Sequence, residues 1–190
     1  MYQKYFKRLF DIILSLILII FLLPLMILIF FLIWFVIGFP IFSQIRPGIN
    51  NKIFTLYKFK TLYDFSRNIS EKKRQNALGN FLRKTGLDEL PQIINILQNK
   101  MSFVGPRPLL VEYLKIKKFK EHDRKKVKPG ITGLAQIDSF HNNVKFKNDK
   151  WEKQFQSDKY YVNNLTLMID LKILYITFLK AISFSKKDYH

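Results

Sequence analysis

The most prominent feature of the hydrophobic pattern is one continuous apolar run near the start of the chain. Residues 12–39 carry no charged side chain, and only Ser15, Pro24 and Gly38 interrupt the large apolar types. A straight helix of this length extends about 42 Å, whereas the hydrocarbon core of a bilayer is about 30 Å thick. The run therefore predicts a membrane helix that is too long for a simple crossing, and Pro24 near its centre predicts a kink.

Basic residues lie on both sides of this run, which bears on its topology: Lys4, Lys7 and Arg8 before it, and Arg46, Lys52, Lys58 and Lys60 after it. Positive flanks favour the cytoplasmic side of a membrane. A helix that enters the membrane, bends at Pro24 and leaves by the same face satisfies both flanks, and a tilted single-pass anchor remains the alternative. The length of the run, and the lack of a small-residue cleavage site after it, argue against a cleaved signal peptide.

After the apolar run, the pattern changes to short strands and loops. Residues 41–61 hold two β-like runs, and Pro47-Gly48 with Asn50-Asn51 is a turn signal between them, so we predict a β-hairpin. The polar stretch 64–76 predicts a loop or a short helix. The stretches 101–108 and 128–133 contain the prolines and glycines of loops.

Helical spacing of apolar residues recurs in the remaining segments, at Ala77–Lys84, Leu90–Leu97, Leu109–His122, Trp151–Tyr161 and Leu167–Ile182. The helix predicted at 109–122 has a basic side, and places at the membrane interface and on the domain core both remain open. The last helix has charged side chains at Asp170, Lys172 and Lys180 and is short for a crossing, so we expect it to be buried or interfacial.

These elements predict a mixed α/β fold with a membrane part and a soluble part. Residues 1–40 form the membrane helix, 41–185 form one domain with a short hairpin and interfacial amphipathic helices, and 186–190 form a tail. The 190 residues are enough for this arrangement but not for two full soluble domains.

Composition narrows the partners and the chemistry. The formal net charge is +18, which implies an anionic partner. Beside a membrane segment, lipid headgroups and phosphorylated substrates rank above nucleic acid, and a merely solubilising basic surface is the alternative. The chain has no Cys, which excludes a disulfide framework, a thiolate metal site and a Cys nucleophile.

Asp88 and Glu89 are the residues with the clearest chemical potential. They stand at the start of the helix predicted at 90–97, where two acids have a plain role in capping and in compensating the helix dipole. The functional alternative is that Asp88 is a nucleophile toward phosphorus and Glu89 holds Mg²⁺. Basic side chains would then neutralise the transferring phosphoryl group.

Three basic residues are candidates for that neutralising role. Lys58 and Lys60 are two apart on a predicted strand and should point the same way, toward a phosphate or toward water. Arg107 lies between Pro106 and Pro108, which present its guanidinium with little flexibility.

Other catalytic and nucleotide-binding motifs are missing from the sequence. There is no P-loop sequence and no G-x-G-x-x-G, and the three His residues lack the spacing of a zinc site. These observations argue against a P-loop enzyme, a dinucleotide-binding domain and a zinc enzyme.

Five strings, in order, resemble the bacterial sugar transferases, the monotopic polyprenyl-phosphate phosphoglycosyl transferases. They are Gln44-x-Arg46-Pro47-Gly48, Lys58-Phe59-Lys60-Thr61, Leu87-Asp88-Glu89-Leu90-Pro91-Gln92, Gly105-Pro106-Arg107-Pro108 and Pro129-Gly130-Ile131-Thr132-Gly133-Leu134-Ala135-Gln136. The resemblance runs from about residue 3 to about residue 182. The stretches 52–61 and 105–114 are especially similar to the Campylobacter-type undecaprenyl phosphate N,N'-diacetylbacillosamine 1-phosphate transferase.

The resemblance implies a reaction and a set of site residues. Asp88 would attack the β-phosphate of a UDP-sugar, release UMP and carry the phosphosugar until undecaprenyl phosphate takes it, while Glu89 holds Mg²⁺. The substrate- or phosphate-binding residues implied are Lys58, Lys60, Arg83, Arg107 and Gln136. The apolar helix would be re-entrant, bent at Pro24, with the catalytic domain on the cytoplasmic face of the bacterial inner membrane. No nucleic-acid partner is implied, and homo-oligomer formation remains open.

One departure from the family pattern affects the nucleotide contact. The family usually has Asn-Gly-Arg two residues after the Ala-Gln pair, whereas this chain has Asp138-Ser139-Phe140 and several extra residues before Trp151. Lys145 or Lys147 would be the substitutes for the missing Arg, and the identity of the sugar stays open. The alternatives to the transferase are a non-catalytic, membrane-tethered scaffold of a glycosylation complex and a membrane-bound nucleic-acid binder.

Overall fold

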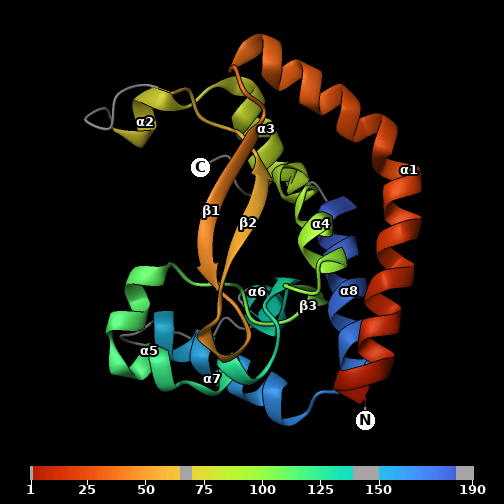
Figure 1. The fold of residues 1–190 in the computed structure, drawn as a ribbon, viewed down its shortest axis with the longest axis vertical. Helices are drawn as coiled ribbons and strands as arrows, with labels where there is room; N and C mark the ends of the chain where they lie inside the picture. The colour runs from red at the N-terminus through yellow and green to blue at the C-terminus, as the bar shows by residue number, and fades with distance from the viewer. Residues whose placement is uncertain (1, 65–69, 139–149, 183–190) are drawn as a thin grey trace.

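The computed structural model describes residues 2–64, 70–138 and 150–182 (Figure 1). The apolar run forms one helix, α1 (Lys7–Val36), which a single π-helical turn precedes at Tyr2–Phe6. Pro24 lies inside α1, and Figure 1 shows the helix bending along its length. It is the one helix within the described residues that is long and apolar enough to cross a membrane, and 11% of its most apolar window is buried.

Both halves of α1 pack against the rest of the chain. In the first half, the Asp11 carboxylate accepts hydrogen bonds from the Ser102 hydroxyl and the Phe103 amide. In the second half, Ile29 and Ile33 are buried in a cluster with side chains that come from β2 and α3. The middle of the helix, around Ile20 and Phe21, is exposed. The side chains of α1 that pack on the domain therefore lie on either side of this exposed centre.

The predicted hairpin is confirmed. Strands β1 (Ile41–Pro47) and β2 (Ile53–Phe59) pair antiparallel in a register that sets Ile41 opposite Phe59 and Pro47 opposite Ile53. Asn50 and Asn51 take the left-handed conformations that the turn requires. The buried Phe54 and Leu56 of β2 join the main core.

The main core lies between the hairpin and the C-terminal helices. It gathers buried side chains from the hairpin, from α4 (Gln92–Leu97), from the segment around strand β3 (Ser102–Val104), and from α7 (Lys150–Asn163) and α8 (Leu167–Ile182). Its members are Phe54, Leu56, Ile96, Met101, Phe103, Val104, Val127, Ile137, Tyr161 and Ile173. The helices predicted at 151–161 and 167–182 are confirmed as α7 and α8, and the helix at 77–84 is confirmed as α3 (Ala77–Thr85).

The two stretches expected to be loops each contain a short strand. Strand β3 pairs in parallel with β4 (Gly130–Thr132). A Cβ atom on Gly105 would lie 2.4 Å from the Lys128 carbonyl oxygen, and one on Gly130 would lie 2.1 Å from the Gly105 nitrogen. The backbones approach so closely that only glycine fits at these two positions. The strands have three residues each, too few for a periodic signal in the sequence.

The continuous helix predicted over 109–122 is wrong. The structure has a 3-10 turn at Val111–Lys115 and a short helix α5 (Lys117–Glu121), with Ile116 extended between them. The rings of Tyr113 and Phe119 stack with centroids 5.0 Å apart. Residues six apart lie on different sides of an α-helix, so this stacking requires the break. The predicted helix over 90–97 is also shorter, because α4 starts at Gln92.

The remaining elements complete the chain. The polar stretch 64–76 contains α2 (Glu71–Arg74), and a further 3-10 turn covers Asp123–Lys126. Helix α6 (Leu134–Asp138) follows β4. Ser139, Phe140, Lys145, Lys147 and the predicted tail 186–190 lie outside the described residues.

Candidate active site

Asp88 and Glu89, here called the acid pair, lie in a 3-10 turn (Leu87–Glu89) between α3 and α4. Gly86 ends α3 in the left-handed conformation, with φ of 72°, which turns the chain into this segment. Neither acid caps a helix: Pro91 holds the capping position of α4, and no side chain makes the capping hydrogen bond of α4 or of the 3-10 turn. The capping explanation of the acid pair therefore has no support in the hydrogen bonds of this segment.

Two cations from distant parts of the chain meet on Glu89. The Lys58 ammonium nitrogen, from β2, lies 2.6 Å from Glu89 Oε1, and the Arg107 Nη2 lies 2.7 Å from the same oxygen. Lys58 Nζ is also 3.9 Å from Asp88 Oδ2. The site thus joins the hairpin, the acid turn and the Pro-Arg-Pro loop, which three separate strings of the sequence encode.

The two neighbouring carboxyl groups have opposite pKa shifts. Burial raises the pKa of Asp88 above its ordinary value, and Glu89 raises it further, while the charge of Lys58 opposes them. Burial also raises the pKa of Glu89, but Arg107 and Lys58 outweigh burial, so the pKa of Glu89 falls below its ordinary value. Environments that separate the pKa values of two adjacent groups are typical of sites with divided chemical roles.

The other predicted site residues are distributed unevenly around the acid pair. Arg83 Nε donates to the Thr61 hydroxyl at 2.7 Å, and the charge of Arg83 opposes the rise that burial causes in the pKa of Asp88. Lys60 follows the end of β2 and forms an ion pair with Asp64 instead of the acid pair. Gln136 lies in α6, where its backbone carbonyl accepts a hydrogen bond from Lys180.

Arg46 is a site residue that we did not predict as such from the sequence. It lies on the same face of the hairpin as Lys58, because cross-strand partners share a face and Arg46 pairs with Phe54. Burial lowers the pKa of Arg46, and the neighbouring charge of Arg107 lowers it further, while Glu112 and Glu89 oppose the shift. The string Gln44-x-Arg46 on the predicted strand was the available signal. Residues two apart on a strand point the same way, so this spacing places Gln44 and Arg46 on one face of the hairpin.

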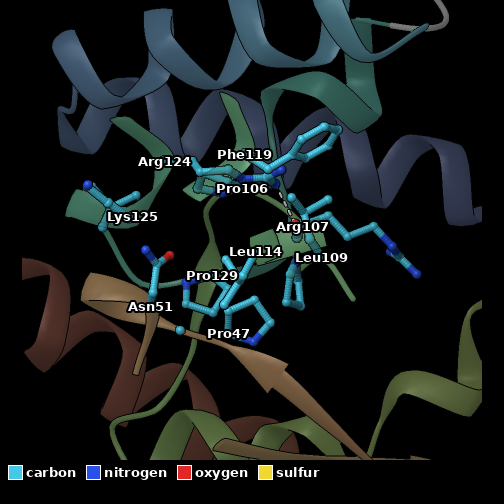
Figure 2. Close-up of a pocket in the computed structure, with 13 residues that line it drawn as sticks. Pro47, Asn51, Pro106, Arg107, Leu109, Leu114, Phe119, Arg124, Lys125 and Pro129 are labelled. Atoms are coloured by element: carbon cyan, nitrogen blue, oxygen red, sulfur yellow. Dashed lines mark hydrogen bonds between the residues drawn. The ribbon is translucent and has the colours of Figure 1, made fainter. Parts of the chain in front are cut away.

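A small pocket opens behind the Pro-Arg-Pro loop, at the turn end of the hairpin (Figure 2). Prolines and apolar side chains form much of its wall, together with three basic residues. Its lining residues are Pro47, Gly48, Asn51, Pro106, Arg107, Pro108, Leu109, Leu114, Phe119, Arg124, Lys125, Val127 and Pro129. Within the part of the chain that the structure describes, no acidic residue lines this pocket, so its charge suits an anionic ligand.

The geometry of the site can be compared with known proteins. The family described as bacterial sugar transferase matches residues 2–184.

The chain belongs to the bacterial sugar transferase family.

Relatives of this sugar transferase include proteins named as transferases that act on undecaprenyl phosphate. It is 43% identical over 145 residues to the uncharacterized sugar transferase EpsL of Bacillus subtilis, covering 74% of this chain and 69% of EpsL. It is 37% identical over 150 residues to the UDP-glucose:undecaprenyl-phosphate glucose-1-phosphate transferase of Klebsiella pneumoniae, covering 74% of this chain and 32% of that enzyme. The undecaprenyl-phosphate galactose phosphotransferase of Salmonella typhimurium is 33% identical over 195 residues, covering 92% of this chain and 40% of that enzyme. The chain thus spans about a third of the Klebsiella enzyme and two fifths of the Salmonella enzyme.

Proposed function

We propose that this sugar transferase moves a sugar 1-phosphate from a UDP-sugar to undecaprenyl phosphate and releases UMP. The observation that carries the proposal is the acid pair, with a buried Asp88 beside a Glu89 that holds Lys58 and Arg107. Such a site joins a carboxylate nucleophile to fixed positive charge, the combination that phosphoryl transfer uses. The names of the Klebsiella and Salmonella relatives support the same class of reaction.

The proposed reaction has two displacements at one phosphorus atom. In the first, an Asp88 carboxylate oxygen forms a bond to the β-phosphorus of the UDP-sugar, and the bond from that phosphorus to the bridging oxygen breaks, which releases UMP. In the second, a phosphate oxygen of undecaprenyl phosphate attacks the same phosphorus, and the bond to Asp88 breaks. Lys58 and Arg107, which lie beside the acid pair, would neutralise the charge on the transferring group.

Residues that fit Mg²⁺ are present in the acid pair. Mg²⁺ uses oxygen ligands, usually one or two carboxylates together with substrate phosphates. Glu89 Oε1 accepts from Lys58 and Arg107, while Oε2 makes no hydrogen bond within the described residues, so Glu89 has an oxygen for the ion. Among the described residues, no group of three or more His, Asp or Glu side chains is placed to hold a metal ion. Substrate phosphates would therefore complete the coordination. Bound there, Mg²⁺ would offset negative charge on the diphosphate.

We further propose that α1 is re-entrant, so that the domain lies on the cytoplasmic face of the inner membrane. Both halves of α1 pack on one domain, the first through Asp11 and the second through Ile29 and Ile33, while its centre is exposed. A straight spanning helix would carry its second half away from the domain. Pro24 lies within the exposed central part, where a bend would dip into the lipid.

The identity of the transferred sugar is the most detailed part of the proposal. The sequence resemblance at 52–61 and 105–114 supports the Campylobacter-type donor, UDP-N,N'-diacetylbacillosamine, as the first one to test. The relatives named for glucose and galactose supply UDP-glucose and UDP-galactose as the next two. The product would enter glycoconjugate biosynthesis at its first membrane step.

A screen of UDP-sugars tests the proposed function. Purified protein in detergent is given each UDP-sugar with Mg²⁺ and undecaprenyl phosphate, and release of UMP is measured. We expect release with one donor and little with the others. No UMP from any donor, with a folded protein, would favour a non-catalytic scaffold instead.

A further inference from the structure

The loop that carries Arg107 is held by its backbone carbonyl groups. Pro106 and Pro108 have no amide hydrogen to donate. All three carbonyls of the tripeptide accept hydrogen bonds: Pro106 from the Gly130 amide at 3.1 Å, Arg107 from Arg124 Nη2 at 2.5 Å, and Pro108 from Arg46 Nη1 at 3.2 Å. Two guanidinium groups from different elements thus donate hydrogen bonds to the backbone carbonyl groups of Arg107 and Pro108.

Arg124 is itself fixed. It is buried in the 3-10 turn that ends at Lys126, and its Nη2 lies 3.2 Å from Asp158 Oδ2 on α7. The ring of Phe155, also on α7, lies 5.8 Å from the Arg124 guanidinium carbon. Figure 2 shows Arg124 reaching across the pocket to the Arg107 carbonyl. Helix α7 is therefore linked to the loop through one buried side chain.

Arg46 holds the loop from the other side. Its Nη2 donates to Gln44 Oε1 at 2.5 Å, two residues earlier on β1, while its Nη1 donates to the Pro108 carbonyl. Contacts at two nitrogens fix the plane of a guanidinium group. The link joins residues that are 62 positions apart in the chain.

Arg107 needs such support because its own side chain is not enclosed. The side chain is 47% exposed, yet its Nη2 lies 2.7 Å from Glu89. An exposed arginine loses rotamer entropy when it is held in one geometry. A fixed backbone reduces the number of positions that the guanidinium can reach.

We propose that Arg46 and Arg124 are positioning residues that hold the Arg107 backbone so that its guanidinium stays on Glu89. We call them the carbonyl clamp. The catalytic consequence of the clamp rests on the proposed function, since it acts on the transfer reaction only through Arg107. Neither clamp residue contacts the acid pair through a hydrogen bond or ion pair within the described residues.

A double-mutant cycle tests the proposal. Arg46→Gln and Arg124→Lys are each made in the wild type and in Arg107→Lys, and kcat/KM is measured from UMP release. In the wild-type background we expect each to lower kcat/KM on the order of tenfold to 100-fold, because small displacements of positioning groups have effects of this size. In the Arg107→Lys background the further loss should be within about threefold, because the guanidinium being positioned is gone. Equal losses in both backgrounds would overturn the proposal.

A matched control removes the same kind of bond elsewhere. Arg74 Nε donates to the Tyr63 carbonyl at 3.1 Å, so Arg74→Gln also deletes an arginine-to-carbonyl hydrogen bond. It should leave kcat/KM close to wild type. Thermal unfolding of every variant detects loss of fold, and Arg46→Gln, on a half-buried residue, carries the test if Arg124→Lys does not fold.

A second readout does not depend on transfer activity. In spectra of protein labelled with ¹⁵N-arginine, the Arg107 side-chain signal is identified by its loss in Arg107→Lys. We expect that signal to be resolved in the wild type and in Arg74→Gln, and to merge with the signals of mobile arginines in Arg46→Gln. An unchanged Arg107 signal in Arg46→Gln would refute the clamp. Absence of UMP release from the wild type would instead refute the proposed function and leave this result valid.

Discussion

Lys7 Nζ lies 2.5 Å from Asp170 Oδ2, although 163 positions separate the two residues in the chain. Both side chains are buried, and Asp170 also accepts hydrogen bonds from the Tyr161 hydroxyl at 2.7 Å and the Tyr2 hydroxyl at 2.5 Å. This cluster ties the start of α1 to α7 and α8. It also shows that the charge of Lys7 is neutralised within the protein and does not face the membrane surface as a free flanking charge.

We predict that Asp170→Asn strongly destabilises the protein. Removing one partner of a buried ion pair leaves the other charge uncompensated, which costs about 3–5 kcal/mol. Lys172→Met, at an exposed position of α8, is the control and should change stability little. Denaturant unfolding in detergent measures both variants. A midpoint of Asp170→Asn equal to that of the control would show that the Lys7–Asp170 pair contributes nothing net.

Local patterns predicted much of the fold. The turn signal at Pro47-Gly48 correctly placed the hairpin, and helical spacing placed α7 and α8. The pattern failed where non-local packing decides the structure. The stacking of Tyr113 on Phe119 breaks the helix predicted there, and the approach of Gly105 to Gly130 makes a parallel strand pair from two loops.

The candidate site shows the same contrast between what local patterns predict and what non-local contacts decide. The acid pair and Arg107 were candidates from their residue types and local positions, the family resemblance then implied their roles, and the structure brings them together. Two-residue spacing predicted that Lys58 and Lys60 point the same way, toward a phosphate or toward water, but β2 ends at Phe59 and Lys60 forms an ion pair with Asp64. The hydrogen bond from Arg46 to Pro108 spans 62 positions, and no local pattern contains it.

The two lysines should therefore differ in function. Lys58→Met removes a cation from both acids, and we expect kcat/KM to fall on the order of 100-fold, as when a stabilising donor is lost from an active site. Lys60→Met removes an ion pair with the exposed Asp64 and should have a much smaller effect. The measurement is UMP release at several donor concentrations. Similar losses in the two variants would mean that Lys60 also reaches the substrate.

Asp158 should give the protein a pH-dependent stability. Burial raises the pKa of Asp158 to about 6, and Arg124 opposes the shift. Since the folded pKa lies above the unfolded value of 3.8, the folded state binds more protons between these values. The free energy of unfolding should then decrease as pH rises from about 4 to about 6, by on the order of 3 kcal/mol from this residue. Asp158→Asn should remove that contribution.

The comparison of unfolding profiles isolates this residue. Denaturant midpoints of the wild type and of Asp158→Asn are measured from pH 4 to pH 8, and the difference between the two profiles is examined. A difference that is constant with pH would show that Asp158 has an ordinary pKa in the folded protein.

If α1 is re-entrant, as proposed, both of its ends lie on the same side of the membrane. The natural chain has no Cys, so single Cys residues at Gln3 and Asn50 report each side separately. We expect a membrane-impermeant thiol reagent to label both only after the inner membrane is permeabilised. Labelling of Gln3→Cys from the periplasm, with Asn50→Cys protected, would establish a spanning helix. Pro24→Ala should move part of the population toward that state, because it restores the missing backbone donor.

The central prediction is that Asp88→Asn abolishes transfer while leaving the fold intact. An amide keeps the shape of the carboxylate but cannot form the acyl-phosphate bond that the first displacement requires. Because burial raises the pKa of Asp88, its charged form gains little in the folded protein, and the substitution should change stability within about 1 kcal/mol.

The wild type, incubated with its UDP-sugar and no acceptor, should release UMP and gain the mass of a phosphosugar on the peptide that contains Asp88. Asp88→Asn should show neither. Glu89→Gln, which weakens the hold on Lys58 and Arg107, should retain slow adduct formation that extra Mg²⁺ increases. An adduct on another residue, or full activity in a folded Asp88→Asn protein, would exclude Asp88 as the nucleophile and leave the acid pair with a purely structural role.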